Sequence, residues 1–318
     1  MIGCGDVTEK KSGPAFNKVK NSKLVSVMCR TPGRAEDYAR RHGIPRWSNR
    51  AEELLSDKEI DAVYIATPPD SHLYYTELAA NYRKAVYVEK PMARTYEECK
   101  HMIKACDHAG VPLFVAYYRR YLPKFLKVKE LIDSNIVGEI RTVSIHLLLP
   151  PRSEDVNSGE LPWRVIPEIA GGGYFMDLAS HQFDLLDYLL GPIADAAGTF
   201  AHQTGWYPAE DIVSAHFRFE NGILGNGLWC FSISEYNQMD RTIIFGNRGT
   251  ISFSFFDTRP VELKTAAGLK KIKVSSPEHV QQPLIKAVVN TLLGKDQCVS
   301  TGVSAARTNA VLGLILKQ

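Results

Sequence analysis

Short apolar runs alternate with longer amphipathic segments over the first third of the chain. Each run is rich in β-branched or other apolar residues and is followed by a turn signal, as expected of strands buried on both faces. The strands expected here cover residues 24–29, 62–66, 85–88 and 113–116. Strands separated by helix-length segments are typical of βαβ units, so the pattern predicts a parallel sheet.

The intervening segments carry helix start and stop signals. A helix is expected over residues 31–41, with Gly43 as its stop. Ser71 is expected to cap a second helix, and Thr95 with Glu98 reads as the capping box of a third. These helices fill the gaps between the strands of the βαβ units.

The pattern changes after residue 120. A helix is expected over 124–134, followed by longer, mostly consecutive strands over 139–149, 210–220, 223–233, 240–246 and 249–256. Turn signals at 220–222 and 246–249 predict hairpins and hence an antiparallel sheet. The glycines at 171–173 are followed by a helix-length segment that runs to Leu190, and a further helix is expected over 305–316. We therefore predict an α/β chain: a Rossmann domain at 1–120 and an α+β domain with a large open, predominantly antiparallel sheet at 121–318.

Composition narrows the class of protein. The chain has 318 residues, enough for two domains, and is 45% hydrophobic and 23% charged, as in ordinary globular proteins. Its 38 basic and 35 acidic side chains leave a net charge of +3 without a basic stripe, which argues against nucleic acid as a partner.

Cysteine usage and hydropathy predict the compartment. The six cysteines form no CxxC pair and no Cys/His cluster, so neither a metal site nor a disulfide framework is expected. The sequence also shows no leader-like start and no apolar run long enough to span a membrane. We expect a cytoplasmic protein with no membrane partner.

The first residues suggest a nucleotide site. Gly3, Cys4 and Gly5 precede a helix-compatible stretch beginning at Asp6 and Val7, an arrangement that lets a backbone approach a pyrophosphate at a helix N-terminus. The third glycine of the fingerprint is replaced by Thr8. The alternative is an ordinary glycine turn, but its position at the first βαβ unit favours a dinucleotide.

The end of the second strand of a Rossmann fold normally reads the adenosine ribose. Here Cys29 and Arg30 follow the strand, with Arg34 one turn further and no carboxylate nearby. A guanidinium suits a 2′-phosphate by charge and geometry, so NADP is favoured over NAD. The alternative is that both arginines are solvated surface charges.

Two constellations point to catalysis. In the first, the strand at 85–88 ends in Glu89, Lys90 and Pro91, at the carboxyl edge where α/β folds bind ligands, and the Lys-Pro bond can be cis. In the second, Asp177 and His181 are spaced to share one helical face within an apolar helix. A histidine beside a carboxylate suits proton transfer during alcohol oxidation. The alternatives are polar residues at a strand end and a solvated helix face.

These motifs together resemble one family. Residues 65–72 (Ile-Ala-Thr-Pro-Pro-Asp-Ser-His), the Glu89-Lys90-Pro91 turn, and a Gly-Gly-Gly helix with Asp177, His181 and Asp184 are similar to the glucose-fructose oxidoreductase / inositol dehydrogenase / MocA (Gfo/Idh/MocA) family. The resemblance covers essentially the whole chain. It implies NAD(P)-dependent hydride transfer at a sugar-like or cyclic polyol carbon.

The resemblance also implies roles for individual residues. Lys90, Asp177 and His181 match the family's catalytic positions. The cofactor is expected to contact Gly3, Cys4, Gly5, Asp6, Val7, Cys29, Arg30, Arg34, Ala66, Thr67, Pro68, His72, Glu89, Lys90 and Arg119. The substrate is expected to contact Lys90, Tyr118, Trp163, Arg164, Asp177 and His181.

The expected reaction is reversible oxidation of a secondary alcohol. His181 would take the hydroxyl proton, Lys90 would stabilise the charge on the same oxygen, and Asp177 would orient substrate and imidazole. Two alternatives stay open: a non-catalytic NAD(P)-binding regulator of the same fold, and a glycosidase assisted by NAD.

Association is expected as well. The apolar strands near residues 243–245 and 251–256 suggest a sheet face that needs covering, so a homodimer or homotetramer through the C-terminal sheet is expected. The substrate itself is not named by the sequence.

Overall fold

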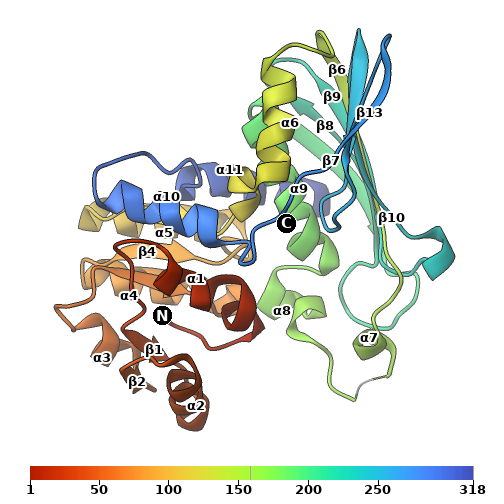
Figure 1. Cartoon of the computed structure of the whole chain (residues 1–318). Helices are drawn as coiled ribbons and strands as arrows, with labels where there is room; N and C mark the ends of the chain where they lie inside the picture. Colours follow the sequence, from red (N-terminus) through yellow and green to blue (C-terminus); the bar gives the residue numbers. More distant parts are fainter. Residues whose placement is uncertain (158, 318) are drawn as a thin grey trace. The chain divides into compact units, whose positions relative to one another are not determined.

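A computed structural model of the chain describes residues 1–157 and 159–317 (Figure 1). The chain divides into two compact units. Unit 1 comprises Met1–Arg120 and Pro277–Ala306, and unit 2 comprises Tyr121–Ser276 and Arg307–Gln318. The sequence-based boundary placed all of 121–318 in the second domain, whereas the structure returns 277–306 to unit 1. The division between units falls inside the last helix.

Unit 1 is built on a parallel sheet. Its strands are β1 (Ser26–Met28), β2 (Arg46–Ser48), β3 (Ala62–Ile65), β4 (Ala85–Val88) and β5 (Leu113–Val115). Ile2 bridges Met28 and Ile65 in parallel register, so the first residues of the chain take the central place between β1 and β3. The resulting order, β2-β1-Ile2-β3-β4-β5, is that of a Rossmann fold.

Five helices lie between these strand positions in the sequence: α1 (Gly13–Lys18), α2 (Pro32–His42), α3 (Ala51–Leu55), α4 (His72–Asn81) and α5 (Tyr96–Ala109). A further helix, α10 (Gln282–Leu292), joins the unit from much later in the chain. The buried core lies between helices and sheet and includes Ile2, Val63, Val86 and Met102. The four predicted strands of this unit are present, while β2, α3 and α10 were not predicted.

Three predicted helix caps can be compared with the structure. Gly43 takes the left-handed conformation, with φ of 63°, and ends α2 as expected. Thr95 Oγ1 accepts the Glu98 amide, but the Glu98 carboxylate binds the Arg94 amide and guanidinium, so the capping box is not reciprocal. Ser71 occupies the N-cap of α4, yet its hydroxyl bonds Thr67 and Pro68 instead of capping the helix.

Unit 2 contains one large sheet. Its strands are β6 (Ile140–Leu148), β7 (Ile193–Ala201), β8 (Ile212–Phe219), β9 (Leu224–Cys230), β10 (Met239–Gly246), β11 (Gly249–Phe253), β12 (Val261–Thr265) and β13 (Gly268–Ile272). The order is β13-β12-β11-β10-β6-β9-β8-β7, antiparallel throughout except for the parallel pair β6 and β9. Both predicted hairpins are present, whereas β7, β12 and β13 were missed.

The helices of this unit are α6 (Pro123–Asp133), α7 (Ser153–Asn157), α8 (Pro167–Ala170), α9 (Tyr174–Leu190) and the part of α11 (Gly302–Leu316) from Arg307 onward. Helices α6, α9 and α11 pack on the sheet. Phe183 of α9 packs against Phe217 and Trp229, and Phe125 of α6 packs against Phe253. These contacts fix α9, the helix that carries the predicted catalytic pair, on β8 and β9.

Within the described residues, no helix is long and apolar enough to cross a membrane.

Candidate functional site

The glycine turn follows the central strand position of unit 1. The Gly3 amide donates to the Met28 carbonyl at 2.8 Å, and Gly3 has φ of 101°. A Cβ on Gly3 would lie 2.5 Å from the Ala66 carbonyl oxygen, so only glycine fits there. At Gly5, by contrast, a Cβ would meet no atom within 4 Å, which leaves open space beside the turn. The turn therefore offers the cradle that a pyrophosphate requires.

The helix after the turn contains a π-helical segment, Thr8–Ser12. Thr8 stands where the third fingerprint glycine was expected, and its amide and hydroxyl both donate to the Gly5 carbonyl. The close-packing role falls instead to Gly13, where a Cβ would lie 2.2 Å from the Thr8 carbonyl oxygen and 2.3 Å from Tyr38 Oη. Gly13 lies five positions beyond Thr8 and so falls outside the fingerprint spacing by which the sequence was searched.

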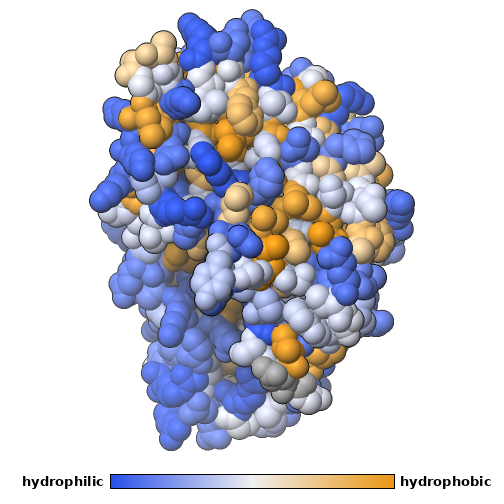
Figure 2. Space-filling model, turned by 90° about the vertical axis from the view of Figure 1, so that its right-hand side faces the viewer, coloured by the Kyte–Doolittle hydropathy of each residue, from blue (hydrophilic) through white to orange (hydrophobic). Residues whose placement is uncertain are grey.

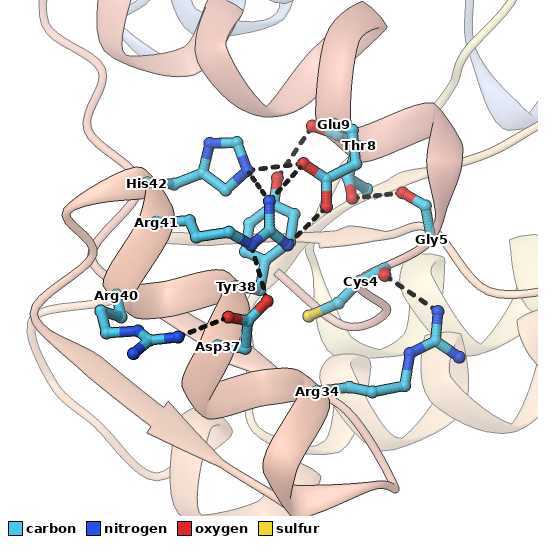
Figure 3. A network of polar contacts seen from close by, with 10 residues as sticks. All are labelled: Cys4, Gly5, Thr8, Glu9, Arg34, Asp37, Tyr38, Arg40, Arg41 and His42. Atoms are coloured by element: carbon cyan, nitrogen blue, oxygen red, sulfur yellow. Dashed lines mark hydrogen bonds and ion pairs between the residues drawn. The ribbon is translucent and has the colours of Figure 1, made fainter.

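The residues expected to contact the adenosine ribose of the cofactor follow strand β1. Arg30 and Arg34 are exposed, and Arg34 Nη2 approaches the Cys4 carbonyl at 3.5 Å (Figure 3). Burial raises the pKa of the Cys4 thiol to about 12, so this side chain is an uncharged packing group. The guanidinium of Arg34 thus lies beside the glycine turn, where anionic groups of a dinucleotide would bind.

The acidic side chain of Glu9, on the π-helical segment after the glycine turn, is paired with basic side chains of α2. The carboxylate of Glu9 is bound by Arg41 at 2.8 Å and by His42 Nε2 at 2.7 Å, and Arg41 also binds Asp37 (Figure 3). Hydrogen bonding to Arg41 lowers the pKa of Glu9 to about 2. The negative charge of Glu9 is therefore directed at α2 and offset there.

The loop after β3 is tied to the loop after β4. Ala66, Thr67 and Pro68 follow the strand directly, and the fully buried ring of His72 joins the two loops. His72 Nε2 lies 2.8 Å from the Thr67 carbonyl oxygen, and Nδ1 lies 3.1 Å from that of Met92. Burial lowers the pKa of His72, although the carbonyls favour the protonated ring. His72 thus connects predicted cofactor-binding segments through their backbones.

Lys90 leaves the carboxyl end of β4. The Lys90–Pro91 peptide is cis, in agreement with the expected tight turn. Glu89, predicted to lie near the nicotinamide ribose, is buried and bonded to other groups of unit 1. Beyond β5, Arg119 Nη1 donates to Tyr118 Oη at 3.0 Å and the guanidinium lies over the Tyr118 ring. All of these residues follow strand ends of one sheet.

In unit 2, three glycines precede the helix α9. Gly171 and Gly172 have φ of 80° and 159°, and a Cβ on Gly172 would lie 2.6 Å from Met176 Cγ. A Cβ on Gly173 would lie 2.8 Å from Ala209 Cβ. The Gly173 amide donates to the buried carboxylate of Glu210 at 2.9 Å. Burial raises the pKa of Glu210, and the Gly173 amide acts in the opposite direction. The run of glycines thus allows a buried acid to meet the N-terminus of α9.

Asp177 and His181 lie on α9 as predicted. Arg164 Nε lies 3.5 Å from Asp177 Oδ2, and the Arg164 guanidinium stacks over the Trp163 ring. His181 is buried, with its ring 6.2 Å from that of Phe256. The structure therefore brings together three of the predicted substrate residues, Trp163, Arg164 and Asp177, within unit 2.

A further contact of the loop at 150–167 was not predicted. Tyr174, at the start of α9, donates its hydroxyl to buried Asp155 at 2.6 Å, and the Arg152 guanidinium lies 4.3 Å from the Tyr174 ring centroid. Burial raises the pKa of Tyr174, so its hydroxyl stays protonated and donates. This contact anchors the loop that carries Trp163 and Arg164 to the helix that carries Asp177.

The predicted site residues divide between the units. Unit 1 holds all of the predicted cofactor residues together with Lys90 and Tyr118, and unit 2 holds Trp163, Arg164, Asp177 and His181. Among residues 1–157 and 159–317, no group of His, Cys, Asp and Glu side chains is arranged to hold a metal ion.

In unit 1 a glycine turn and the polar loops after four further strands line the carboxyl edge of one parallel sheet, which defines a Rossmann-type nucleotide-binding unit. Residues 1–117 match the family model described as an oxidoreductase family with an NAD-binding Rossmann fold, and residues 125–252 match the family's C-terminal domain. The chain belongs to the Gfo/Idh/MocA oxidoreductase family.

Individual relatives agree with this assignment. An oxidoreductase of Formosa agariphila is 41% identical over 293 residues, which are 92% of this chain and 90% of that protein. The scyllo-inositol 2-dehydrogenase (NAD(+)) of Bacillus subtilis is 29% identical over 276 residues, which are 84% of this chain and 77% of that protein. A levoglucosan dehydrogenase, solved with NADH and levoglucosan, superimposes with a TM-score of 0.89 at 21% identity, covering 99% of this chain and 95% of that one. This last likeness shows the shared fold.

Proposed function

We propose that the protein is an NAD(P)-dependent oxidoreductase that interconverts a secondary alcohol and a carbonyl on a sugar, polyol or related cyclic substrate. The observation that carries this proposal is the position of the predicted cofactor residues. Gly3, Cys29, Ala66 and Glu89 each follow the carboxyl end of a different, neighbouring strand position of one parallel sheet. Such an edge is where open α/β sheets bind dinucleotides.

The nicotinamide group, when bound, supplies the hydride acceptor or donor for the reaction. Gly3 and Gly5 would hold the pyrophosphate of the dinucleotide. The loop at Ala66–Pro68 and Glu89 would lie along the ribose that carries the nicotinamide. In the oxidation direction, the substrate hydroxyl loses its proton to His181 while the carbon loses hydride, which leaves a carbonyl. The ammonium of Lys90 stabilises the developing negative charge on that oxygen, and Asp177 orients the substrate.

NADP is the favoured cofactor in this proposal. The strand end at Cys29 offers no carboxylate to the ribose, and Arg30 and Arg34 are exposed beside it. A guanidinium pairs with a phosphate through charge and parallel hydrogen bonds. The relatives named above include one protein that uses NAD(+) and one solved with NADH, so NAD is the competing cofactor.

The substrate class draws on the same relatives. One of these relatives is a scyllo-inositol dehydrogenase and the other was solved with levoglucosan, and both compounds are polyhydroxylated rings. In this chain, the carboxylate of Asp177 and the guanidinium of Arg164 lie together at 3.5 Å and can bond several hydroxyl groups at once. A ring with adjacent hydroxyls or a carbonyl fits these groups.

We also propose a homodimer or homotetramer formed through the sheet of unit 2. The apolar residues that motivated this expectation, such as Ile244 and Ile251, are covered within the chain. The other face carries short polar side chains, with Ser144 bonded to Asn226, and exposed Leu224 beside them. Hydrophobic and polar residues are interspersed on the face of the molecule in Figure 2. Light scattering on the full chain tests the oligomeric state, and a monomer at micromolar concentration would contradict it.

The first test of the enzyme proposal is binding and turnover. The full chain is titrated with NADPH and NADH, following quenching of its four tryptophans and energy transfer to the reduced ring. Sugar and polyol carbonyls are then screened for oxidation of the reduced cofactor. We expect saturable cofactor binding and turnover of at least one substrate, and no binding of either cofactor would overturn the proposal.

Two alanine variants test the catalytic roles proposed for Lys90 and His181. Lys90→Ala and His181→Ala are expected to lower kcat by about 100-fold or more while the cofactor Kd changes less than about threefold. Equal turnover of both variants and the wild type would remove the proposed catalytic roles.

A further inference from the structure

A buried hydrogen-bond network surrounds the residue before Lys90. Glu89 is 6% exposed, and its Oε1 accepts a hydrogen bond from Tyr64 Oη at 2.5 Å and another from Gln281 Nε2 at 2.5 Å. Its Oε2 accepts the Lys90 backbone amide at 3.2 Å. Gln281 is fully buried and lies 192 residues from Glu89 in the sequence. All of these groups belong to unit 1.

The hydrogen bonds of this network extend from Glu89 to a second tyrosine, Tyr87. Burial raises the pKa of both Tyr64 and Tyr87 well above the usual range, so each keeps its proton and donates it. Tyr87 Oη donates to Gln281 Oε1 at 2.9 Å, which leaves the Gln281 amide NH2 to face Glu89. A carboxylate only accepts hydrogen bonds, and here it meets three donors. The three contacts at 2.5, 2.5 and 3.2 Å thus account for both oxygens of the Glu89 side chain.

Rigid elements hold the donors. Tyr64 lies in β3 and Tyr87 in β4, and their rings stack with centroids 4.9 Å apart. Phe16 of α1 packs on the Tyr64 ring at 5.3 Å. Gln281 is the N-cap of α10, and its backbone amide donates to the Lys11 carbonyl. Tyr64 and Gln281 are both held by packed elements, so a movement of the Glu89 side chain would break its hydrogen bonds to them. The carboxylate is therefore held in one position.

The turn is also held on its other flank. The Nδ1 atom of His72 lies 3.2 Å from the Pro91 carbonyl oxygen and 3.1 Å from that of Met92. The backbone on both sides of Lys90 is therefore tied to buried side chains. The Lys90 side chain itself is only partly buried and leaves from the middle of this held segment.

We propose that Tyr64 and Gln281 are positioning residues for Lys90: by fixing the Glu89 carboxylate, they set the direction in which the lysine leaves β4. This inference rests on the proposed function, in which Lys90 stabilises charge on the reacting oxygen. Neither residue is expected to touch substrate or cofactor. Both act through Glu89 and so form a single unit.

The test uses Tyr64→Phe, Gln281→Leu and the double variant in the full chain. Each single variant is expected to lower kcat about tenfold, since a small misplacement of a catalytic group is costly, and the Kd of the cofactor, whose ribose Glu89 would contact, should change by a clearly smaller factor. The double variant is expected to resemble the single ones, because both changes release the same carboxylate. In a Glu89→Gln background, Tyr64→Phe should have little further effect.

Tyr38→Phe is the matched control. Tyr38 is also a buried tyrosine of unit 1 whose hydroxyl donates one hydrogen bond, to the Thr8 carbonyl at 2.8 Å, but it has no link to Glu89. This variant should lose some thermal stability and keep its kcat within about twofold. Losses of kcat in Tyr64→Phe and Gln281→Leu no larger than in the control, or fully multiplicative effects in the double variant, would overturn the proposal.

A second readout does not depend on activity. The rate of reductive methylation of Lys90, measured by peptide mass spectrometry, reports its orientation and surroundings. Two lysines serve as internal references: exposed Lys23, and partly buried Lys84, whose ammonium donates to the Asp57 and Ile60 carbonyls. We expect at least a threefold change for Lys90 in both variants and none for the references. Unchanged Lys90 methylation would refute the positioning role, even if no substrate is found and the proposed function fails.

Discussion

The carboxylate of Glu210 accepts a hydrogen bond from the backbone amide of Gly173 at 2.9 Å, directly before the helix that carries Asp177 and His181. A negative charge at a helix N-terminus is favourable, and here it also fixes where α9 begins. The contact depends on glycine, because a Cβ on Gly173 would lie 2.8 Å from Ala209 Cβ and 3.0 Å from the Glu210 carbonyl oxygen.

Gly173→Ala is therefore expected to separate α9 from the Glu210 segment. Overpacking of this kind costs about 1–3 kcal/mol of stability, and turnover should fall as the pair on α9 shifts. Thermal unfolding and kcat measure both effects.

Gly33→Ala is the control for this change, because Gly33 lies within α2 and a Cβ there would meet no atom within 4 Å. It should raise the stability by about 0.5–1 kcal/mol, since alanine favours the helix. If Gly173→Ala were as stable as Gly33→Ala, the close approach of Gly173 to Ala209 and Glu210 would not contribute to the free energy of unfolding.

Gly13 is expected to be equally intolerant. In Gly13→Ala the new methyl group would meet the Thr8 carbonyl oxygen at 2.2 Å, and the π-helical segment would have to rearrange. We expect a loss of stability of about 1–3 kcal/mol and weaker binding of the reduced cofactor, measured by thermal unfolding and fluorescence titration. Adding Tyr38→Phe should not restore either property, because the backbone clash remains. Full rescue by that second change would show that the hydroxyl alone is the obstacle.

Glu9 gives the stability of unit 1 a pH dependence of known sign. Arg41 lowers the pKa of Glu9 from 4.5 to about 2 in the folded chain. Because the folded pKa is the lower one, the carboxylate stabilises the fold fully above about pH 4.5, and this contribution is lost as the pH falls through 2. Glu9→Gln should lower the Tm at pH 7 by about 2 °C, as for a partly exposed ion pair in a chain of this size.

The measurement is the difference in Tm between wild type and Glu9→Gln from pH 7 downward, which should shrink below pH 4.5. Glu139→Gln removes an exposed carboxylate paired with Arg141 and serves as the control, with a smaller and flatter difference. A Glu9 difference that grows toward acid pH would contradict the assignment.

Arg30 is expected to decide between the two cofactors. Arg30→Ala should weaken NADPH binding about tenfold, the loss of one charge-assisted contact, and leave NADH binding within about twofold. Arg40→Ala removes an exposed arginine of α2 that pairs with Asp37, and neither affinity should change. A wild type that prefers NADH and is indifferent to Arg30→Ala would assign the cofactor to NAD.

Much of the site follows from local sequence alone. The glycine turn at Gly3, the strand ending in Glu89 and Lys90, and the spacing of Asp177 and His181 on one helix depend on residues close together in the chain. Strand and helix periods express the same short-range rules, which is why the Rossmann fold and the mostly antiparallel sheet were predicted.

Tertiary structure decided the contacts that join distant segments. Nothing near Glu89 in the sequence indicates that Gln281, 192 residues away, bonds its carboxylate, or that residues 277–306 return to unit 1. In the same way Glu210 lies 37 residues beyond the glycine whose amide it binds, and the close approach of Gly13 to the Thr8 carbonyl oxygen depends on the π-helical segment between them. Pattern along a chain reports which faces are apolar, whereas buried polar partners are selected by the three-dimensional packing that excludes water from both.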